Sequence, residues 1–563
     1  MDPAAGAFAY HERTKHHFHR YARSLGYLDW ATQPDPFRTF DGAPRVELPL
    51  VADRVATHYR DLYSTGAVPP ERLAVDSVAA FFELALGLTA WKELGESRWA
   101  LRADPSSGNL HPTEGYAVLP EVTGLPAGVH HYVSRDHCLE HRCRLDPGAA
   151  RALTEGLPPG GFLVGISSIH WREAWKYGER AFRYCQHDAG HVIGTVRYAA
   201  AALGWSARLL DGVGDARVGA LLGLDREGDF AEVEPVEREH PDAVLLVAPE
   251  PFDGWDGIEE VARLLAEGSW SGTANALSSD HVDWGVIELV HGATLQPPSA
   301  PPPPVEHPDR PPLRSACETP AATIVRQRRS AVALDGVTSV SSETFYGMLD
   351  ATLPRAGAAP WDVLPWPPRI HLGLFVHRVG GIAPGLYLFE RTEDVRPRFE
   401  ALLGAKPRWT RPPGCPDHLR LSCIDEVDCR RAAAAVSCHQ DIAADGAFSL
   451  GMLAEFHDPI ASGAFRYRQL FWEAGVLGQV LYLEAEAAGV RSTGIGCYFD
   501  DAAHEVFGLE GDAFQSMYHF TVGGPVDDPR LVTLPPYAHL GPRSLRAPHA
   551  GDGHEDHGEE RQG

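Results

Sequence analysis

The segment from Arg102 to Glu114, RADPSSGNLHPTE, gathers side chains that could grip a polar planar ligand. Pro105, Ser106, Ser107 and Asn109 place two hydroxyls, an amide and a flexible backbone on one short turn before the strand-like run TEGYAVL. An ordinary Ser/Asn/Gly loop is the alternative interpretation. The sequence has no Walker phosphate loop, strand-following GxGxxG motif, HExxH zinc motif or GxSxG nucleophile motif, so the chemistry must come from less common patterns.

The pattern R-x-x-P-S-S-G-N-L-H-P-x-E resembles the flavin-contacting loop of the nitroreductase-like FMN enzymes, which implies that Arg102 and the turn after it contact FMN. With three later segments, the resemblance covers most of residues 102–540. IVRQRRSAVALDG is similar to the family's opening motif, whose arginine and serine engage the FMN phosphate and ribityl chain; here these are Arg328, Arg329 and Ser330. Arginine suits that role because its forked donors are always charged.

The other two segments lie close to the C-terminus. RSTGIGCYFDD, residues 491–501, resembles the stretch whose backbone amide approaches the flavin N5 atom, which implicates Gly494 and Gly496. VGGPVDDPR resembles the family's closing segment and ends at Arg530, the implied phosphate-binding base. The alternative interpretation is that the Arg-Arg-Ser triplet is a solvated turn and RSTGIG the end of a strand.

The segment WREAWKYGERAFRYCQHDAGH, residues 171–191, resembles the SagB/ThcOx branch of the family, which oxidises azolines to azoles on peptides. A Lys-Tyr pair precedes the core helix in that branch, and Lys176 and Tyr177 match it. The resemblance implies that FMN accepts a hydride while this pair handles the accompanying proton, because an amine desolvated beside a flavin can act as a base. The alternative is an exposed lysine and a packed tyrosine at the start of a helix.

The elements that must position these residues occur twice. Residues 183–225 align with residues 468–510 at a constant offset of 285, which brings Gly190 onto Gly475 and Asp215 onto Asp500. Small and apolar residues recur at helical spacing from about 179 to 203 and from 468 to 488, which predicts one long buried helix in each copy. We therefore expect an α+β fold: a nitroreductase-like fold duplicated in tandem, each half a β-sheet flanked by helices, forming an intrachain pseudo-dimer.

The motifs are divided between the two halves. The Pro-Ser-Ser-Gly-Asn loop is found only in the first half, and the Arg-Arg-Ser triplet is clear only in the second. In the family, FMN lies at a dimer interface and takes these two motifs from opposite subunits. The resemblance therefore implies one complete FMN site per chain and a degenerate second site. At the 285 offset, Lys176 and Tyr177 correspond to Ala461 and Ser462, so the proton-handling pair also occurs once.

The chain of 563 residues divides into five expected parts. These are a basic N-terminal arm (1–30), a first nitroreductase-like domain (31–295), a Pro-rich linker (296–314), a second domain (315–545) and a disordered tail (546–563). The N-terminal histidines 11, 16, 17 and 19 are expected to lie on a solvated arm. The spacing of Cys415, Cys423, Cys429 and Cys438 matches no common zinc or iron–sulfur pattern, so no metal site is predicted.

Composition excludes several classes of function. The net charge of −26 makes nucleic acid and anionic membranes poor partners, and 44% apolar with 22% charged residues is typical of a globular chain. The most apolar stretch, residues 79–91, is too short to span a bilayer. With no signal peptide and nine cysteines, a cytoplasmic protein with reduced thiols is expected.

The favoured function is an FMN-dependent dehydrogenase of SagB/ThcOx type that acts on an azoline-like or other small substrate, either free or part of a modified peptide. Two alternatives stay open. One is an NAD(P)H-dependent reductase of nitro compounds or quinones. The other is a non-catalytic scaffold whose flavin site has decayed. The fused pseudo-dimer could act as a monomer, and the sequence leaves open whether it pairs further.

Overall fold

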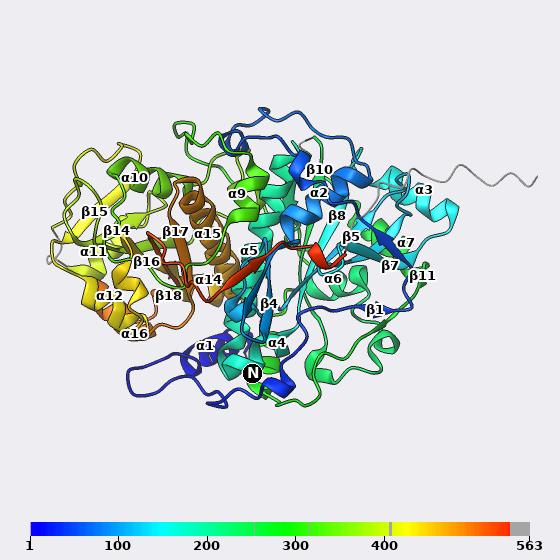
Figure 1. The fold of residues 1–563 in the computed structure, drawn as a ribbon, viewed down its shortest axis with the longest axis horizontal. Helices are drawn as coiled ribbons and strands as arrows, with labels where there is room; N and C mark the ends of the chain where they lie inside the picture. Colours follow the sequence, from blue (N-terminus) through cyan, green and yellow to red (C-terminus); the bar gives the residue numbers. More distant parts are fainter. Residues whose placement is uncertain (1, 251, 253, 314, 405–407, 541–563) are drawn as a thin grey trace, which may run out of the picture.

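The computed structural model describes residues 2–250, 252, 254–313, 315–404 and 408–540, and it places two β-sheets on either side of a central pair of long helices (Figure 1). The sheet of the first half has the order β11-β7-β6-β5-β8-β10-β9, and β2 also pairs with β7. The strands are β2 (Arg45–Glu47), β5 (Thr113–Leu119), β6 (Gly128–Val133), β7 (Cys138–Arg144), β8 (Phe162–Ser168), β9 (Ser206–Leu209), β10 (His240–Ala248) and β11 (Ser269–Trp270).

The second half repeats this topology. Its sheet has the order β15-β14-β13-β16-β18-β17, which matches β7-β6-β5-β8-β10-β9 strand for strand, and every neighbouring pair is antiparallel in both sheets. The strands are β13 (Ile370–Val376), β14 (Gly385–Glu390), β15 (Arg420–Asp425), β16 (Phe448–Glu455), β17 (Arg491–Ile495) and β18 (Phe514–Gly523). The two halves are therefore two copies of one α+β arrangement.

Both faces of each sheet are buried because successive side chains of a strand point in opposite directions. In β16, Leu450 and Met452 enter a core shared by the two halves, whereas Leu453 enters an outer core. In β8, Val164 and Leu163 divide in the same way. The outer helices are α3 (Pro147–Gly156), α6 (Asp215–Leu222) and α7 (Ile258–Ala266) in the first half, and α11 (Arg396–Leu403), α12 (Arg430–Val436), α13 (Ile442–Asp445) and α16 (Asp500–Phe507) in the second.

The remaining helices pack around the shared core or at its edges. They are α1 (Pro3–Arg13), α2 (Val75–Ala85), α4 (His170–Tyr177), α5 (Ala181–Ala202), α8 (Gly285–Ala293), α9 (Ala321–Gln327), α10 (Ser342–Ala351), α14 (His457–Ser462) and α15 (Arg466–Ala487). The central pair, α5 and α15, cross where two glycines meet. A Cβ atom on Gly190 would lie 2.4 Å from the carbonyl oxygen of Trp472, and one on Gly475 would lie 2.3 Å from that of His187. Only glycine permits such a close approach.

Two ion pairs near this crossing each join a residue of one half to a residue of the other. Arg183 of the first half lies 2.7 Å from Asp500 of the second, and Arg468 of the second lies 2.5 Å from Asp215 of the first. Both arginines and both aspartates are related by the 285-residue offset, so the interface is isologous like that of a two-fold dimer. Burial opposes the ionisation of Asp500, but Arg180 and Arg183 hold the pKa of this carboxyl below its ordinary value.

The end of the second domain crosses onto the first. β19 (Val532–Leu534) pairs with β3 (Leu88–Leu94), which pairs with β4 (Ser97–Arg102), to form a separate three-stranded sheet. A two-stranded ribbon of β1 (Phe40–Asp41) and β12 (Thr273–Ala274) lies within the first half. The expected domain boundary at residue 315 therefore separates the two domains along the sequence, but the last strand of the second domain packs with the first.

The expectation of a solvated N-terminal arm is wrong for residues 3–16. Helix α1 buries Ala7, Tyr10 and His11, and His11 lies 3.2 Å from both the Tyr467 hydroxyl and the Gln515 side-chain oxygen of the second half. The apolar positions of AAGAFAY form one helical face that packs between the halves, which a count of basic residues does not reveal.

The described part of the Pro-rich segment forms no regular secondary structure. Residues 295–313 contain no helix or strand, and the Ser299 N–H donates to the carbonyl oxygen of Gly212 at 2.9 Å. Arg314 and the tail 546–563 lie outside the described residues. Cys415, Cys423 and Cys429 are buried free thiols within apolar cores. No helix in the described part of the chain is long and apolar enough to cross a membrane.

Candidate active site

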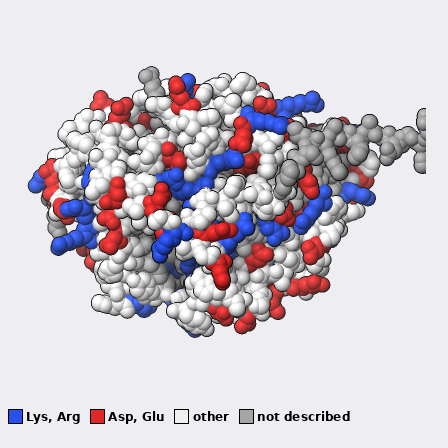
Figure 2. Space-filling model, viewed as in Figure 1, with Lys and Arg blue, Asp and Glu red and all other residues white. Residues whose placement is uncertain are grey.

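A cavity of about 680 Å³ lies between the two halves, and both contribute to its walls. Lys and Arg side chains gather in the middle of this face of the molecule, where the halves meet (Figure 2). The first half contributes Lys92, Trp99, Leu101, Arg102, Asp104, Pro105, Ser106, Asn109 and His111. The second half contributes Gln327, Arg328, Arg329, Ser330, Ala331, Val332, Arg491, Pro525, Val526, Asp527, Asp528, Pro529, Leu531 and Thr533.

The first-half wall is the predicted Pro-Ser-Ser-Gly-Asn loop, which follows the end of β4. The Ser106 hydroxyl accepts a 2.8 Å hydrogen bond from the His111 N–H and thereby closes the turn. Gly108 and Asn109 both have positive φ angles, of 66° and 56°. Asparagine tolerates this backbone conformation and glycine adopts it at no steric cost, which explains why these residue types occur there. Ser107 lies on the same turn.

Lys176 and Tyr177 lie directly against this loop. A Cβ atom on Gly108 would be 2.9 Å from Lys176 Nζ and 2.8 Å from the Tyr177 hydroxyl. Both side chains come from the last turn of α4, which follows β8, the strand that pairs with β5 beyond the loop. The predicted proton-handling pair and the predicted cofactor loop are therefore neighbours in space, although about 70 residues separate them in the sequence.

The second-half wall carries the Arg-Arg-Ser triplet, which follows α9. Arg328 donates to the carbonyl oxygen of Arg102 at 3.0 Å, and Arg329 donates to that of Thr89 at 3.1 Å, so both arginines reach across to the first half. The Ser330 hydroxyl lies 2.8 Å from that of Tyr482.

The two arginines have no ion-pair partner in the part of the chain that the structure describes. Among the described residues neither guanidinium pairs with a carboxylate, and the buried Nε of Arg328 has no hydrogen-bond partner. Burial, followed by repulsion from Arg328 and Arg491, lowers the pKa of Arg329 to about 10. Burial and the charge of Arg329 also lower the pKa of Lys92. A phosphate or another anion would satisfy this group of cations.

The predicted glycines lie beside the cavity rather than on its lining. A Cβ atom on Gly494 would be 1.9 Å from the Tyr518 hydroxyl, and one on Gly496 would be 2.2 Å from the ring of Tyr184. The ring of Tyr184 in turn packs 4.4 Å from that of Tyr177. A row of tyrosines thus connects the Lys-Tyr pair to the end of β17.

The structure does not bring the side chain of Arg530 into the cavity. Its side chain is 75% exposed, and its guanidinium lies 2.6 Å from Asp528 in a local ion pair. Asp528 and Pro529 line the cavity, so the closing segment reaches the site while this side chain points away. Lys92 and Arg491 supply additional positive charge, although Arg491 also pairs with Glu486 at 3.1 Å. Arg491 belongs to the RSTGIG stretch already singled out, whereas Lys92 stands on β3 without a motif of its own.

Three buried carboxyls behind the loop were missed by the sequence analysis. Burial raises the pKa of Asp104 to about 7, with Arg102 and Arg328 acting in the opposite direction. Burial and the neighbouring Asp188 raise the pKa of Glu173, while the charge of Lys176 lowers it. Burial likewise raises the pKa of Asp188. The available signals were Asp188, an acidic residue inside the predicted long buried helix, and acidic residues within or beside two of the motifs.

This arrangement offers two chemical functions in one place. The cations of the second half, with Lys92 and Arg102, could bind an anionic group such as a phosphate. The loop and the Lys-Tyr pair could orient a polar ring and exchange a proton with a bound substrate. The cavity volume falls within the roughly 300–1,000 Å³ typical of small-molecule and cofactor sites.

Two proteins are similar in sequence to parts of this chain. The chain is 29% identical over 198 residues to the trifolitoxin-processing protein TfxB of Rhizobium leguminosarum bv. trifolii, an alignment that covers 32% of the chain and 53% of TfxB. It is 29% identical over 106 residues to "Putative nitroreductase MJ1384" of Methanocaldococcus jannaschii, covering 18% of the chain and 52% of the relative. The chain thus spans about half the length of these relatives. No protein-family model matches.

The fold comparison covers almost the whole chain. The crystal structure of a "putative nitroreductase" from Anabaena variabilis superposes with a TM-score of 0.65 at 22% identity, covering 92% of this chain and 99% of that one. The chain therefore has the nitroreductase-like fold, duplicated within one polypeptide, and the family resemblance inferred from its motifs is confirmed at the level of the fold.

Proposed function

We propose that the chain binds one FMN in the cavity between its halves and acts as an FMN-dependent oxidoreductase, a dehydrogenase of SagB/ThcOx type. The observation that carries this proposal is the group of uncompensated cations at the cavity. Arg328 and Arg329 arrive from the second half opposite the Pro-Ser-Ser-Gly-Asn loop of the first, and they lack an anionic partner among the described residues. A flavin phosphate would supply that anion.

The residues present fit FMN. Arg328, Arg329 and Ser330 would hold the phosphate and ribityl chain, while Pro105, Ser106, Ser107 and Asn109 would contact the polar edge of the ring. When bound, FMN supplies a hydride acceptor. Two residues of the chain have roles in proton transfer. The Nζ of Lys176 accepts the proton that the substrate carbon or nitrogen releases, and the Tyr177 hydroxyl, held against the same glycine, orients that amine or passes the proton on.

The substrate is proposed to be an azoline-like ring or another small group carried on a modified peptide. The name of TfxB describes it as processing trifolitoxin, which favours a peptide substrate. The exposed edge of the cavity, formed by β3, β4 and the segment from Pro525 to Leu531, is consistent with a ligand that extends into solvent.

A second candidate is an NAD(P)H-dependent reductase of nitro compounds or quinones, because MJ1384 is named as a nitroreductase. This reaction needs the same flavin site but no Lys-Tyr pair. Anaerobic mixing of the purified holoprotein with NADH, NADPH or an azoline-bearing peptide, followed at the flavin absorption band, separates the two. Bleaching by the azoline supports the dehydrogenase, and rapid bleaching by a reduced nicotinamide alone supports the reductase.

The proposed cofactor is tested by the absorption spectrum of the purified full-length chain together with a flavin-to-chain ratio. We expect a yellow protein with one FMN per chain. A ratio near two would contradict the single composite site. A colourless protein that neither binds added FMN nor gains thermal stability from it would favour the non-catalytic scaffold.

A further inference from the structure

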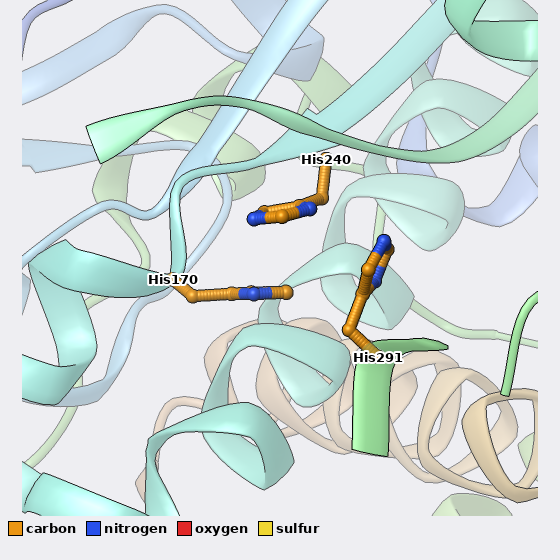
Figure 3. Close-up of side chains that lie close together, drawn as sticks. All are labelled: His170, His240 and His291. Carbon is orange, nitrogen blue, oxygen red and sulfur yellow. The ribbon is translucent and has the colours of Figure 1, made fainter. Parts of the chain in front are cut away.

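Three histidines from three separate elements of the first half converge outside the proposed flavin cavity (Figure 3). His170 is the first residue of α4, His240 the first residue of β10, and His291 lies near the end of α8. One ring nitrogen from each lies within 4.8 Å of the others. The three residues are spread over more than 120 positions of the sequence, so only the fold brings them together.

The ring of His170 is buried without a hydrogen bond to any described residue. The residue is 2% exposed, and neither ring nitrogen has a hydrogen-bond partner among the described residues. The stacked pair of His130 and His141 provides an internal comparison. There the Nε2 of His130 lies 2.8 Å from the carbonyl oxygen of Pro126, and the Nε2 of His141 lies 3.2 Å from that of Ala127. Buried polar groups normally have such partners, so an exception requires an explanation.

The local charges favour neutral imidazole, the form that binds metals. Burial, then the neighbouring His240 and His291, lower the pKa of His170. Burial and His240 also lower the pKa of His291. The one guanidinium that contributes to both shifts belongs to Arg468, whose charge is already paired with Asp215 at 2.5 Å.

A carboxylate, that of Glu288, lies beside one of the three rings. Glu288 precedes His291 by three residues on α8, so both lie on the same side of that helix. The Oε1 of Glu288 lies 3.5 Å from the Nε2 of His240, and about half of its side chain is exposed. The cluster therefore offers three imidazoles and one carboxylate oxygen, with a route to solvent along the side chain of Glu288.

We propose that His170, His240 and His291, with Glu288, form a binding site for a divalent transition-metal ion, Zn²⁺ being the best fit to a four-ligand nitrogen and oxygen set. The rings of His170 and His240 are nearly parallel, at 11° with centroids 4.3 Å apart (Figure 3). A metal bond lies in the plane of the ring, so loading requires one of these rings to turn about its Cβ–Cγ bond.

Such an ion would cross-link α4, β10 and α8. Helix α4 begins at His170 and ends with Lys176 and Tyr177, so the site would anchor the helix that presents the proton-handling pair. The proposal does not depend on FMN, because the metal ligands and the flavin cavity share no residue. It concerns a site that lies entirely within the first half.

The test uses the full-length chain, freed of metal with a chelator and then titrated with ZnSO₄ by calorimetry and with CoCl₂ by visible absorption. We expect a saturable site that binds one Zn²⁺ per chain with a dissociation constant below about 1 µM and raises the melting temperature. The Co²⁺ form should show the intense visible bands of a four-coordinate ion.

Three variants locate that ion. His291→Ala should weaken Zn²⁺ binding by more than about 100-fold, and Glu288→Gln by about 10-fold or more. His141→Ala, taken from the other stacked pair, is the matched control and should bind Zn²⁺ as the wild type does. Because Glu288 is half-exposed, its variant keeps the test valid even if His291→Ala fails to fold.

The proposal is overturned if the wild type shows no saturable Zn²⁺ binding at micromolar concentration. It is also overturned if His291→Ala and Glu288→Gln both bind as tightly as the wild type, since the ion would then lie on other residues. A Co²⁺ spectrum with only the weak bands of a six-coordinate aqua ion would contradict the ligand set in the same way.

Discussion

The two halves share one topology, yet they build two very different cavities at equivalent places. The first is lined by the loop before β5, by Arg491 of β17 and by the segment after β18. At the second cavity, the equivalent elements are the loop before β13, strand β9 and the segment after β10. They line a groove of about 740 Å³ that includes Pro365, Leu209, Leu210, Phe252 and Trp255.

The charges of the two cavities are opposite. Five cations line the first, namely Lys92, Arg102, Arg328, Arg329 and Arg491, against the acids Asp104, Asp527 and Asp528. The second has Arg208 against Asp211, Asp256 and Glu259, and the linker residues Pro298, Ser299, Pro301, Pro302 and Pro304 form part of its wall. An acidic, apolar groove repels a phosphate. The comparison shows that a duplicated fold can keep its framework while only one of two equivalent cavities is lined mainly by cations.

The largest expected effect concerns the proposed proton-handling pair, Lys176 and Tyr177, which occurs in the first half alone. Lys176→Ala should retain flavin and reduce substrate-driven flavin reduction by roughly 10²–10⁴-fold, the usual contribution of general-base catalysis. Lys176→Arg should be almost as impaired, because a guanidinium stays protonated. Stopped-flow absorption at the flavin band measures the rate. The counterpart of Lys176 in the second half is already Ala461, so Ser462→Ala, at the position that matches Tyr177, is the control. An active Lys176→Arg variant would exclude the base role.

The next effect tests the cations of the composite cavity. Arg329→Ala should weaken FMN binding by about 1.5–3 kcal/mol, or roughly 10- to 150-fold, because a charge-assisted hydrogen bond to phosphate is lost. Arg530→Ala is the matched control, and its binding should change little because that guanidinium faces solvent and pairs with Asp528. Fluorescence titration with FMN gives both affinities. Equal losses in the two variants would show that the closing segment moves Arg530 into the site.

The glycine crossing tests whether the halves depend on each other for stability. Gly190→Ala should lower the free energy of unfolding by about 1–3 kcal/mol or more, because its Cβ would overlap the backbone of α15. Gly347→Ala in α10 is the control, where no atom lies within 4 Å of the added methyl group and alanine should stabilise the helix. Urea unfolding followed by circular dichroism compares them. A neutral Gly190→Ala would mean that α5 and α15 can separate without cost.

The smallest effect is a pH dependence specific to the first cavity. Because the pKa of Asp104 is raised to about 7, this carboxyl changes from mostly protonated at pH 6 to mostly ionised at pH 8. The added negative charge should weaken FMN binding a few-fold as pH rises, whereas Asp104→Asn should show no such loss. Ionisation of the FMN phosphate should strengthen binding as pH rises, and it affects the wild type and Asp104→Asn equally. The FMN dissociation constant of each protein at pH 6 and pH 8 provides the measurement, and parallel pH profiles would contradict the assignment.

Much of the fold could be predicted from local pattern. Residues whose spacing repeats along the chain reveal the 285-residue offset, the two long helices and the matching positions of Gly190 and Asp215. The structure confirms the duplicated α+β arrangement. The burial of α1 could not be predicted from charge, because its apolar face is short and packs between the two halves against residues far away in the sequence.

The sequence by itself determined which motifs the chain contains and in which half each lies. It assigned Ser106 and Asn109 to one wall and Arg328 and Arg329 to the other, because motifs are local runs of residues. Only the tertiary structure decided that Lys92 reaches the same cavity and that Arg530 turns away from it. It also brought His170, His240 and His291 together. These contacts join residues tens to hundreds of positions apart, and their geometry follows from how strands and helices pack rather than from the order of neighbouring residues.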